Sequence, residues 1–460
     1  MTYKQCPRLA SRLLLSFLIL MLASTASAEW KEKVLYSFQG GTDGYQPAGG
    51  VVFDKQGNLY GATTNGGSSS CRGPFQCGTV FQLKPPTKSG DPWTETVLYV
   101  FKGSDSNDGA SPFGGLILDQ AGNLYGTTGY DGTGDCILLG SRVGCGTVYE
   151  LSPPTQKGGA WTETVLYNFK GDTDGQLPVG DLVFDEQGNL YGATQYGGGY
   201  GSCNSSFYQH CGTIFKLSPP KTKGGKWTEK VLHGFKGGKD GANPNGGLVF
   251  DSKGAIYGTT FIGGYNCPHN SGQGCGTVFK LLPPTVIRSS WAESVLYKFS
   301  GPPDGSGPAA GVIFGSSGPL YGTTANGGKS GSGQGTVFQL VPGSNGRWRE
   351  KVLYSFQFGN DGNEPRAGVI FDAKGNLYGT SAGGGAVGGG TVFRLKPKDQ
   401  VNGWAFGVLY TFMGSPDGSY PASNLIFDEA GNLYGTTQQS GNTGQNCGHD
   451  GCGTVFEVSP

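Results

Sequence analysis

Short apolar runs separated by turn residues follow one another along most of the chain. The first complete set covers residues 51–53, 59–61, 79–83 and 96–101, and Gly, Asn, Asp or Pro lies between the runs. β-Branched and aromatic residues dominate these runs, which are too short for helices. The pattern therefore predicts β-strands, and no stretch shows a sustained helical period.

The same set of four runs recurs seven times. Each copy reads approximately W-x-E-x-V-L-Y-x-F, D-G-x-x-P, G-x-[VI]-F-D-x-x-G-N-L-Y-G-[TA]-T and G-T-V-F-x-L. The tyrosine of the Y-G step marks the register, at Tyr60, Tyr125, Tyr191, Tyr257, Tyr321, Tyr378 and Tyr434. These positions are 65, 66, 66, 64, 57 and 56 residues apart. Four strands per unit in seven tandem units is typical of a seven-bladed β-propeller.

The two ends of the chain predict how the ring closes. Residues 30–38 read as a fourth strand without the first three, whereas residues 424–458 read as three strands without a fourth. An N-terminal strand that completes the last blade would remove the exposed sheet edges. We therefore expect an all-β, seven-bladed propeller over residues 29–460, with four strands per blade. A linear solenoid would instead need capping repeats.

The N-terminal segment has the composition of a signal peptide. Lys4, Arg8 and Arg12 precede an apolar run at 13–22, and Ala-Ser-Ala at 26–28 suits a cleavage site. The apolar run is too short to span a bilayer, and no second one follows. We expect residues 1–28 to be removed and the chain to be secreted or periplasmic, without membrane insertion.

Cysteine usage agrees with export. Ten of the eleven cysteines fall in pairs between the Y-G-T-T and G-T-V-F steps of one repeat. The pairs are Cys71/Cys77, Cys136/Cys145, Cys203/Cys211, Cys267/Cys275 and Cys447/Cys452. The fifth and sixth repeats lack both members, so the cysteines come and go together. Disulfides formed in an oxidising compartment explain this best, because the C-x-x-C spacing of metal sites is absent.

Composition argues against several partners. Lys plus Arg and Asp plus Glu both total 33, and no block of like charge stands out. The electrostatic footprint of a nucleic-acid binder is therefore missing, and we expect a monomer with no nucleic-acid partner. The sequence contains no G-x-S-x-G, H-E-x-x-H or P-loop motif and implies no cofactor.

The motifs G-N-L-Y-G-T-T, G-T-V-F and V-L-Y-x-F, together with D-G-x-x-P, resemble the GloVer-type tandem repeat of bacterial extracellular proteins. The resemblance covers nearly the whole chain after residue 28. It implies an exported repeat protein of the choice-of-anchor kind and supplies no catalytic residues. This sequence departs from the family in showing no sorting or membrane segment before Pro460.

Two residues of the fourth strand repeat too regularly to mark a site. A tryptophan begins that strand in every repeat, at Trp30, Trp93, Trp161, Trp227, Trp291, Trp348 and Trp404. Six of the seven W-x-E steps contain the glutamate, for example Glu95 and Glu163. We expect the tryptophans to pack between strands and the glutamates to occupy the strand surface.

An Asp-Gly pair precedes the proline of every repeat. In a propeller of this phase, these loops share one face with the disulfide loops, so seven carboxylates would surround one mouth. The sequence favours a turn in which the aspartate bonds its own backbone. A cation ring is the alternative, with calcium as the ion, although the D-x-D-x-D-G spacing is missing. The ring would comprise Asp43, Asp108, Asp174, Asp240, Asp304, Asp361 and Asp417.

Departures from the repeat are better ligand-binding candidates, because blade geometry does not require them. Asp181 replaces a repeat glycine, and Arg366 lies two residues before the matching glycine of the sixth repeat. The third disulfide loop is aromatic, with Tyr196, Tyr200, Phe207 and Tyr208. Rings held in a disulfide-braced loop suit a binding platform, because bracing limits the entropy lost on binding.

Three functions fit these features. The first is an exported, non-catalytic module that binds a glycan or a cell-surface protein through its disulfide-braced loop face. The second is a secreted polysaccharide hydrolase or lyase whose site is assembled from several blades, and the third is an envelope scaffold. Off-repeat acids, His or Arg at the channel mouth would favour the enzyme. An aromatic shelf would favour glycan binding, and seven similar polar loops would favour the scaffold.

Overall fold

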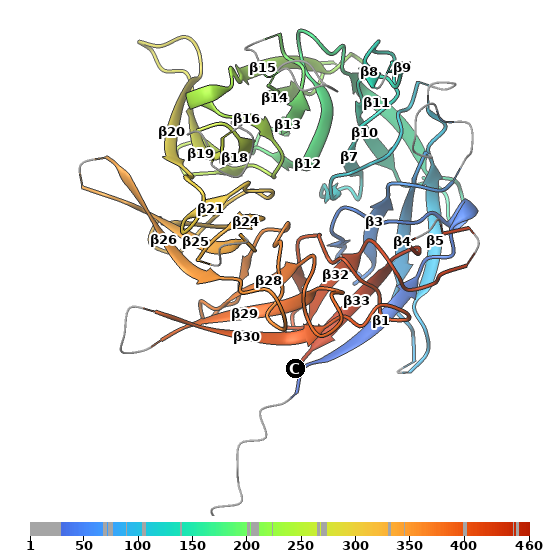
Figure 1. Ribbon diagram of the computed structural model, residues 1–460. Helices are drawn as coiled ribbons and strands as arrows, with labels where there is room; N and C mark the ends of the chain where they lie inside the picture. Colours follow the sequence, from blue (N-terminus) through green and yellow to red (C-terminus); the bar gives the residue numbers. More distant parts are fainter. Residues whose placement is uncertain are drawn as a thin grey trace, which may run out of the picture.

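The expected seven-bladed propeller is the fold of the chain (Figure 1). The computed structural model describes residues 29–460 except 68–70, 72–76, 89, 104–106, 139, 200–202, 204–210, 223, 265–266, 268–273, 330–332, 345, 399–402, 445 and 448–449. In these ranges the extended elements are strands, and the helical turns that lie wholly within them are single 3-10 turns at η1 (Gly41–Asp43) and η3 (Gly238–Asp240). None of the described segments forms a helix long and apolar enough for a membrane span.

Each blade is an antiparallel sheet whose strands are ordered from the axis of the ring to its rim. Blade 1 contains β2 (Val52–Phe53), β3 (Leu59–Thr63), β4 (Thr79–Lys84) and β5 (Thr94–Val100). Blade 2 contains β6 (Ile117–Leu118), β7 (Leu124–Thr128), β10 (Thr147–Ser152) and β11 (Thr162–Asn168), with the small hairpin β8 (Ile137–Leu138) and β9 (Ser141–Arg142) in its loop. Blade 3 contains β12 (Gln176–Phe184), β13 (Leu190–Tyr196), β14 (Thr213–Ser218) and β15 (Thr228–Gly234).

The next two blades carry short additional strands near the axis. Blade 4 contains β16 (Ala242–Pro244), β17 (Val249–Phe250), β18 (Ile256–Ile262), β19 (Thr277–Leu282) and β20 (Ala292–Lys298). Blade 5 contains β22 (Ile313–Phe314), β23 (Leu320–Thr324), β25 (Thr336–Pro342) and β26 (Trp348–Ser355), and β21 (Gly305–Ser306) pairs with β24 (Asn326–Gly327) beside it. Blade 6 has four strands and no additional ones among its described residues. It contains β27 (Ile370–Phe371), β28 (Leu377–Ser381), β29 (Thr391–Pro397) and β30 (Trp404–Thr411).

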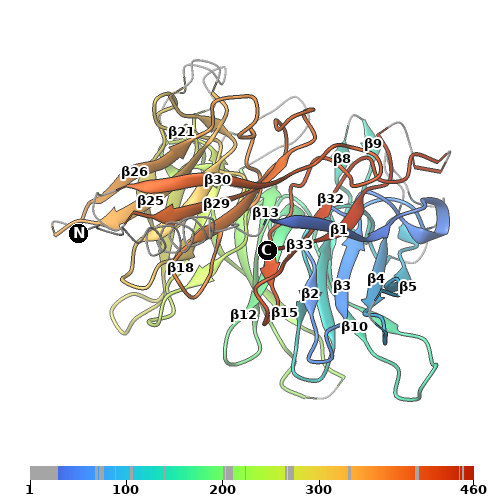
Figure 2. The ribbon, with the colours of Figure 1, turned by 90° about the horizontal axis from the view of Figure 1, so that it is seen from below.

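Blade 7 joins the two ends of the chain, as the sequence predicts. It contains β31 (Ile426–Phe427), β32 (Leu433–Thr437), β33 (Thr454–Ser459) and β1 (Lys31–Ser37). Lys31 lies opposite Ser459 in the antiparallel pairing of β1 with β33. Figure 2 shows the ring from below, with β1 beside β33. The edge of β33 is therefore paired, and blade 7 has four strands like the other blades, because the first strand of the chain is the outer strand of the last blade.

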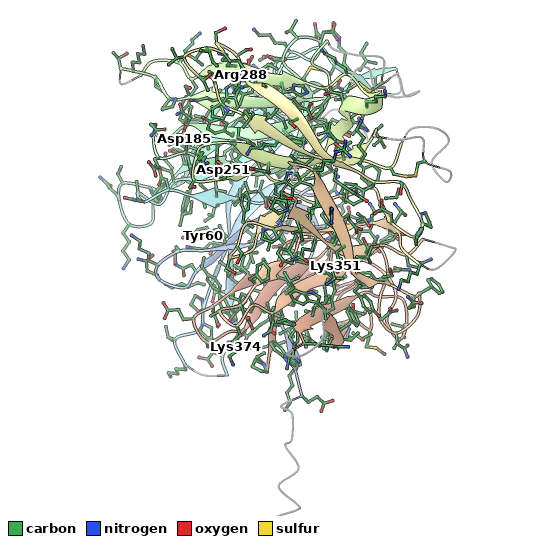
Figure 3. The ribbon with its side chains drawn as sticks, turned by 90° about the vertical axis from the view of Figure 1, so that its left-hand side faces the viewer. Tyr60, Asp185, Asp251, Arg288, Lys351 and Lys374 are labelled. Atoms are coloured by element: carbon green, nitrogen blue, oxygen red, sulfur yellow. A yellow bond between two sulfur atoms is a disulfide. The ribbon has the colours of Figure 1, made fainter. Side chains whose placement is uncertain are left out.

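The repeated Asp-x-x-Gly-Asn turn fixes one face of the ring. Asp54 Oδ1 accepts hydrogen bonds from the amides of Gln56 and Asn58, at 2.8 and 2.9 Å. Its Oδ2 accepts from Asn58 Nδ2 at 2.7 Å and from the Tyr60 hydroxyl at 3.0 Å. Figure 3 labels Asp185, Asp251 and Lys374, from the same turn of blades 3, 4 and 6, along one side of the molecule. The disulfide loops and the Asp-Gly loops therefore share the opposite face.

The core lies between neighbouring blades. The aromatic residue of each G-T-V-F or equivalent step is fully buried, and Phe81 packs edge-on against Phe38 of the preceding blade with ring centroids 5.0 Å apart. All seven repeat tryptophans pack partly buried against these clusters, which confirms their structural role. Backbones approach closely at the axis: a Cβ on Gly246 would overlap Gly311, and one on Gly311 would overlap Gly247.

Candidate ligand-binding site

A repeated backbone hydrogen bond, which we call the clasp, joins each blade to the next on the disulfide-loop face. Its donor is the amide of the residue before the repeat proline, and its acceptor is a carbonyl of the preceding blade. The residue before the repeat proline has a positive φ, between 48° and 63°, in all seven repeats. These residues are Gln46, Ser111, Leu177, Asn243, Gly307, Glu364 and Tyr420. Only one is glycine, so six side chains accept a backbone region that L-residues disfavour.

The clasp explains where the cysteines lie. The amide of Gln46 donates to the carbonyl of Cys452 at 2.8 Å, and the amide of Asn243 donates to that of Cys211 at 2.9 Å. Gln334 and Gly389 take the place of the second cysteine in the fifth and sixth repeats, and their carbonyls accept from the amides of Glu364 and Tyr420 in the same way, both at 2.9 Å. The second cysteine of a pair therefore carries an inter-blade acceptor, and its disulfide limits the freedom of that acceptor.

All five expected disulfides are present. They join Cys71 to Cys77, Cys136 to Cys145, Cys203 to Cys211, Cys267 to Cys275 and Cys447 to Cys452. Five bridges indicate an oxidising, exported environment. The predicted signal peptide lies outside the described residues and stays a prediction.

A cavity of about 260 Å³ lies at the centre of the ring, and residues from all seven blades line it. We call it the channel-mouth cavity, because Gln195, at the end of β13 on the disulfide-loop face, is part of its wall. Small residues that enter the first strand of each blade form most of the lining, for example Gly50, Gly247 and Ala310. The ring is therefore nearly symmetric here, except where the repeat is broken.

Asp181 and Asn424 break that symmetry. Asp181 Oδ1 accepts from the amide of Gly115 at 2.7 Å, and Asn424 Oδ1 accepts from the amide of Gly368 at 2.8 Å. Asn424 Nδ2 donates to Asp181 Oδ2 at 3.0 Å, which links blade 3 to blade 7 across the channel. Asn424 replaces the same repeat glycine as Asp181, so the sequence signal that marks Asp181 as a candidate also marks Asn424, which is not among the predicted site residues.

Arg366, at the start of blade 6, also lines the cavity and is tied to its neighbours. Its Nη2 is 3.1 Å from Glu364 Oε2, and its guanidinium carbon is 5.7 Å from the centre of the Tyr420 ring. Both partners are pre-proline residues with positive φ. This side of the cavity therefore presents a half-exposed cation with fixed neighbours.

Blades 2 and 3 contribute apolar residues to the lining. Phe113, Leu177 and Val179 line the cavity, and they belong to a cluster with Tyr130. Tyr196 packs against this cluster as well, so the structure places one of the four expected aromatic residues beside the cavity wall. The other three, Tyr200, Phe207 and Tyr208, lie outside the described residues, and their role stays a prediction.

The seven Asp-Gly carboxylates are engaged inside their own loops. Six accept a hydrogen bond from the tyrosine of the preceding outer strand, such as Tyr36 to Asp43 at 3.0 Å and Tyr410 to Asp417 at 2.6 Å. In the seventh, His233 Nε2 lies 3.3 Å from Asp240 Oδ1. A backbone amide also donates to each, such as that of Gln39 to Asp43 at 2.6 Å. These contacts are those of a turn, and a cation role stays a prediction.

The described residues show no group of three or more His, Cys, Asp or Glu side chains able to hold a metal ion. The calcium alternative stays a prediction. The carboxylate that reaches the channel-mouth cavity is Asp181, and Arg366 is the cation of its lining.

The W-x-E glutamates lie elsewhere than expected. Each is half-buried between two blades, and one of its carboxylate oxygens is shielded from water with no hydrogen-bond partner. Burial raises the pKa of Glu163 to about 8, and the nearby Asp108 of the preceding blade adds to the shift. We call the contact between two neighbouring blades a seam. In the seam between blades 5 and 6, Phe406 replaces the glutamate and stacks on Tyr354 with 3.8 Å between the ring centres. The prediction of a strand-surface position was wrong, because the outer strand turns this side chain toward its neighbour.

Comparisons with known proteins agree on the repeat and the fold. A family model described as the Gloeobacter/Verrucomicrobia repeat matches residues 21–204 and 199–446. No curated protein sequence matches the chain. A gluconolactonase from Xanthomonas campestris is 15% identical over 95% of this chain and 92% of its own, with a TM-score of 0.39. A protein of unknown function from Dyadobacter fermentans DSM 18053 is 10% identical over 94% of this chain and 98% of its own, with a TM-score of 0.41. Similarity this distant carries no argument about activity.

Proposed function

Because the chain belongs to the Gloeobacter/Verrucomicrobia repeat family and closes its repeats around an asymmetric central cavity, we propose that it is an exported, non-catalytic binding protein for a glycan. The observation that carries this proposal is the composition of the channel-mouth cavity. Phe113 makes part of the lining apolar, and Asp181, Arg366 and Asn424 add polar groups to it. In a sugar site, the apolar face of the sugar packs on an aromatic side chain, and the hydroxyls of the sugar form hydrogen bonds with carboxylate and amide groups.

The size of the cavity supports a single sugar unit. A volume of about 260 Å³ is near the lower end of small-ligand sites, so a terminal residue of a glycan fits better than an internal stretch. The five disulfides hold loops of the face on which the cavity opens. A preformed wall loses little entropy when a ligand binds.

The carboxylate count argues against hydrolysis. Glycoside hydrolysis generally needs two carboxyl groups that flank the scissile bond. Among the described lining residues Asp181 is the single carboxylate, and it already accepts bonds from Gly115 and Asn424. A polysaccharide hydrolase with a site assembled from several blades is therefore the weaker hypothesis.

A glycan array tests the proposal, with every bound glycan recovered and checked for cleavage. We expect selective binding to glycans with a common terminal sugar, and no cleavage. Asp181→Asn should weaken binding at least tenfold, whereas Asp172→Asn, an exposed aspartate of the same face, should not change it. We expect a calcium chelator to leave binding unchanged, because the Asp-Gly carboxylates are already bonded to tyrosines and amides. The proposal would be contradicted if the protein bound no glycan on the array, or if the bound glycans were recovered cleaved.

A further inference from the structure

A second concave surface lies at the rim of the ring, away from the channel-mouth cavity. The hairpin β14–β15 of blade 3 and the hairpin β19–β20 of blade 4 enclose a groove of about 750 Å³. We call it the blade 3–4 groove. Blade 3 contributes Lys216, Lys221, Lys226 and Lys230, and blade 4 contributes Trp291 and Pro284.

This part of the chain is basic in a protein with no net charge. Residues 213–241 contain seven lysines and two acidic residues, whereas the whole chain has 33 of each sign. One of the two acids, Glu229, turns its carboxyl into the seam beside Asp174 of blade 2. The groove therefore presents cations that the local sequence does not balance.

Two of the lysines face each other directly. Lys216 and Lys230 are cross-strand partners on β14 and β15, and like charges in that register destabilise a sheet. In the other six blades the same register never opposes two cations: the pairs include Gln82 with Thr96 and Lys280 with Ser294. Lys216 is partly compensated by Asp185 at 3.9 Å. Within the described chain, Lys230, Lys221 and Lys226 have no acidic group within 4.0 Å.

The walls of the groove suit a carbohydrate. The indole of Trp291 packs its inner part against the core and is half-buried, so its edge reaches the groove. Pro219, Pro220 and Pro284 add apolar rings. Sugar rings pack on such surfaces, while lysines bind the anionic groups that project from them as point charges.

We propose that the blade 3–4 groove binds a strand of anionic polysaccharide, with carboxylate or sulfate groups on the lysines and a sugar face against Trp291. The site is distinct from the channel-mouth cavity and does not depend on the function proposed for it. A repulsive lysine pair costs stability in the free protein, and a bound anion removes that cost.

An anionic membrane is the competing partner, because the neighbouring hairpin tip is apolar. Val286 and Ile287 are fully exposed there, next to Arg288, which Figure 3 places at the upper edge of the molecule. A membrane surface is flat, however, and the lysines line a concavity rather than a ring around the tip. The groove therefore favours a narrow polymer.

Binding of the purified protein to polygalacturonate, dextran sulfate and neutral dextran, measured by biolayer interferometry, tests the proposal. We expect binding to an anionic polymer and not to dextran, with an affinity that falls as salt rises. Lys221→Gln/Lys226→Gln/Lys230→Gln should weaken it at least tenfold. The matched control Lys88→Gln/Lys157→Gln/Lys374→Gln removes the same charge from exposed sites on other blades and should change it less than twofold.

Three results would overturn the proposal. They are no binding to either anionic polymer, equal loss in the two triple variants, and a preference for anionic vesicles that disappears in Val286→Ser/Ile287→Ser. The last would assign the surface to a membrane. The melting temperature reports whether the groove variant folds, and we expect no decrease, because Lys230→Gln relieves the repulsion with Lys216. Asp181→Asn should leave polymer binding intact, so a failure of the channel-mouth proposal would be seen separately.

Discussion

At the residue scale, two side chains distinguish the channel of this protein from a symmetric ring. Asp181 and Asn424 occupy positions where other repeats have glycine, and they meet across the axis at 3.0 Å. Each also accepts an amide hydrogen from a neighbouring blade. They therefore act both as structural links and as the polar part of the proposed sugar site.

Replacing either residue by the repeat glycine should cost stability. We expect Asp181→Gly and Asn424→Gly each to lower the free energy of unfolding by about 1–2 kcal/mol, because each leaves polar partners unsatisfied. The double variant should lose less than the sum, by about 1 kcal/mol, because the shared hydrogen bond is counted in both single changes. Urea unfolding of the four proteins measures this. Strict additivity would show that the link contributes nothing.

The sequence identified part of this site and missed part of it. Asp181 and Arg366 were identifiable, because departures from a sevenfold repeat can be seen without a structure. Asn424 was equally accessible by the same alignment of repeats. The positive φ of residues such as Leu177 and Tyr420 was not predictable, because a bond to the preceding blade imposes it.

At the scale of elements, glycines at the axis set how closely the first strands approach. Gly246 lies against Gly311, whose backbone occupies the space that a Cβ on Gly246 would need, and a Cβ on Gly311 would in turn meet the backbone of Gly247. Neither has a positive φ, so the requirement is one of space rather than of backbone conformation.

Gly246→Ala should therefore destabilise the ring. We expect a loss of about 1–3 kcal/mol, typical of overpacking, together with weaker glycan binding, since Gly246 lines the cavity. Gly407→Ala, in the outer strand β30, is the matched control, because a Cβ there meets nothing within 4 Å. Equal melting temperatures for the two variants would refute this account of the axis.

Strand positions and the ring closure were predictable from sequence, whereas the faces of the outer strands were not. The W-x-E step shows a glutamate on a strand, but only the packing of blades shows that its carboxyl enters the seam. Phe406 makes this visible, since the one repeat without the glutamate fills the same place with a stacked ring.

At the scale of the whole molecule, six seams share one electrostatic property. Burial, and then the aspartate of the preceding blade, raise the pKa of Glu32, Glu163 and Glu350 from 4.5 to about 8. The same causes raise the pKa of Glu95, Glu229 and Glu293 to about 7. A raised pKa means that the folded protein holds these protons more tightly than the unfolded chain does.

Stability should therefore fall as pH rises. The contribution of the glutamates is complete below about pH 4.5 and is lost as pH rises through 7 to 8. Asp185, Asp251 and Asp372, whose hydrogen bonds lower the pKa below 3.8, act oppositely and only in stronger acid. We expect the melting temperature by calorimetry to decrease from pH 5 to pH 9.

Glutamine variants locate the effect. Glu32→Gln/Glu163→Gln/Glu350→Gln should reduce the decrease by about half, because three of six seams no longer ionise. Glu186→Gln, an exposed glutamate of a turn, should leave the profile unchanged. A wild-type melting temperature that stays flat or rises between pH 5 and pH 9 would contradict this description of the seams.

The most direct test of the proposed function is calorimetric titration of the best array glycan into two proteins. One is the natural chain, and the other is Asp181→Gly/Arg366→Ala/Asn424→Gly, in which the channel is close to symmetric. We predict one binding site per chain in the first and at least a hundredfold weaker binding in the second, at a pH where both are folded. Equal affinity would place the ligand elsewhere on the propeller and contradict the assignment of the channel-mouth cavity.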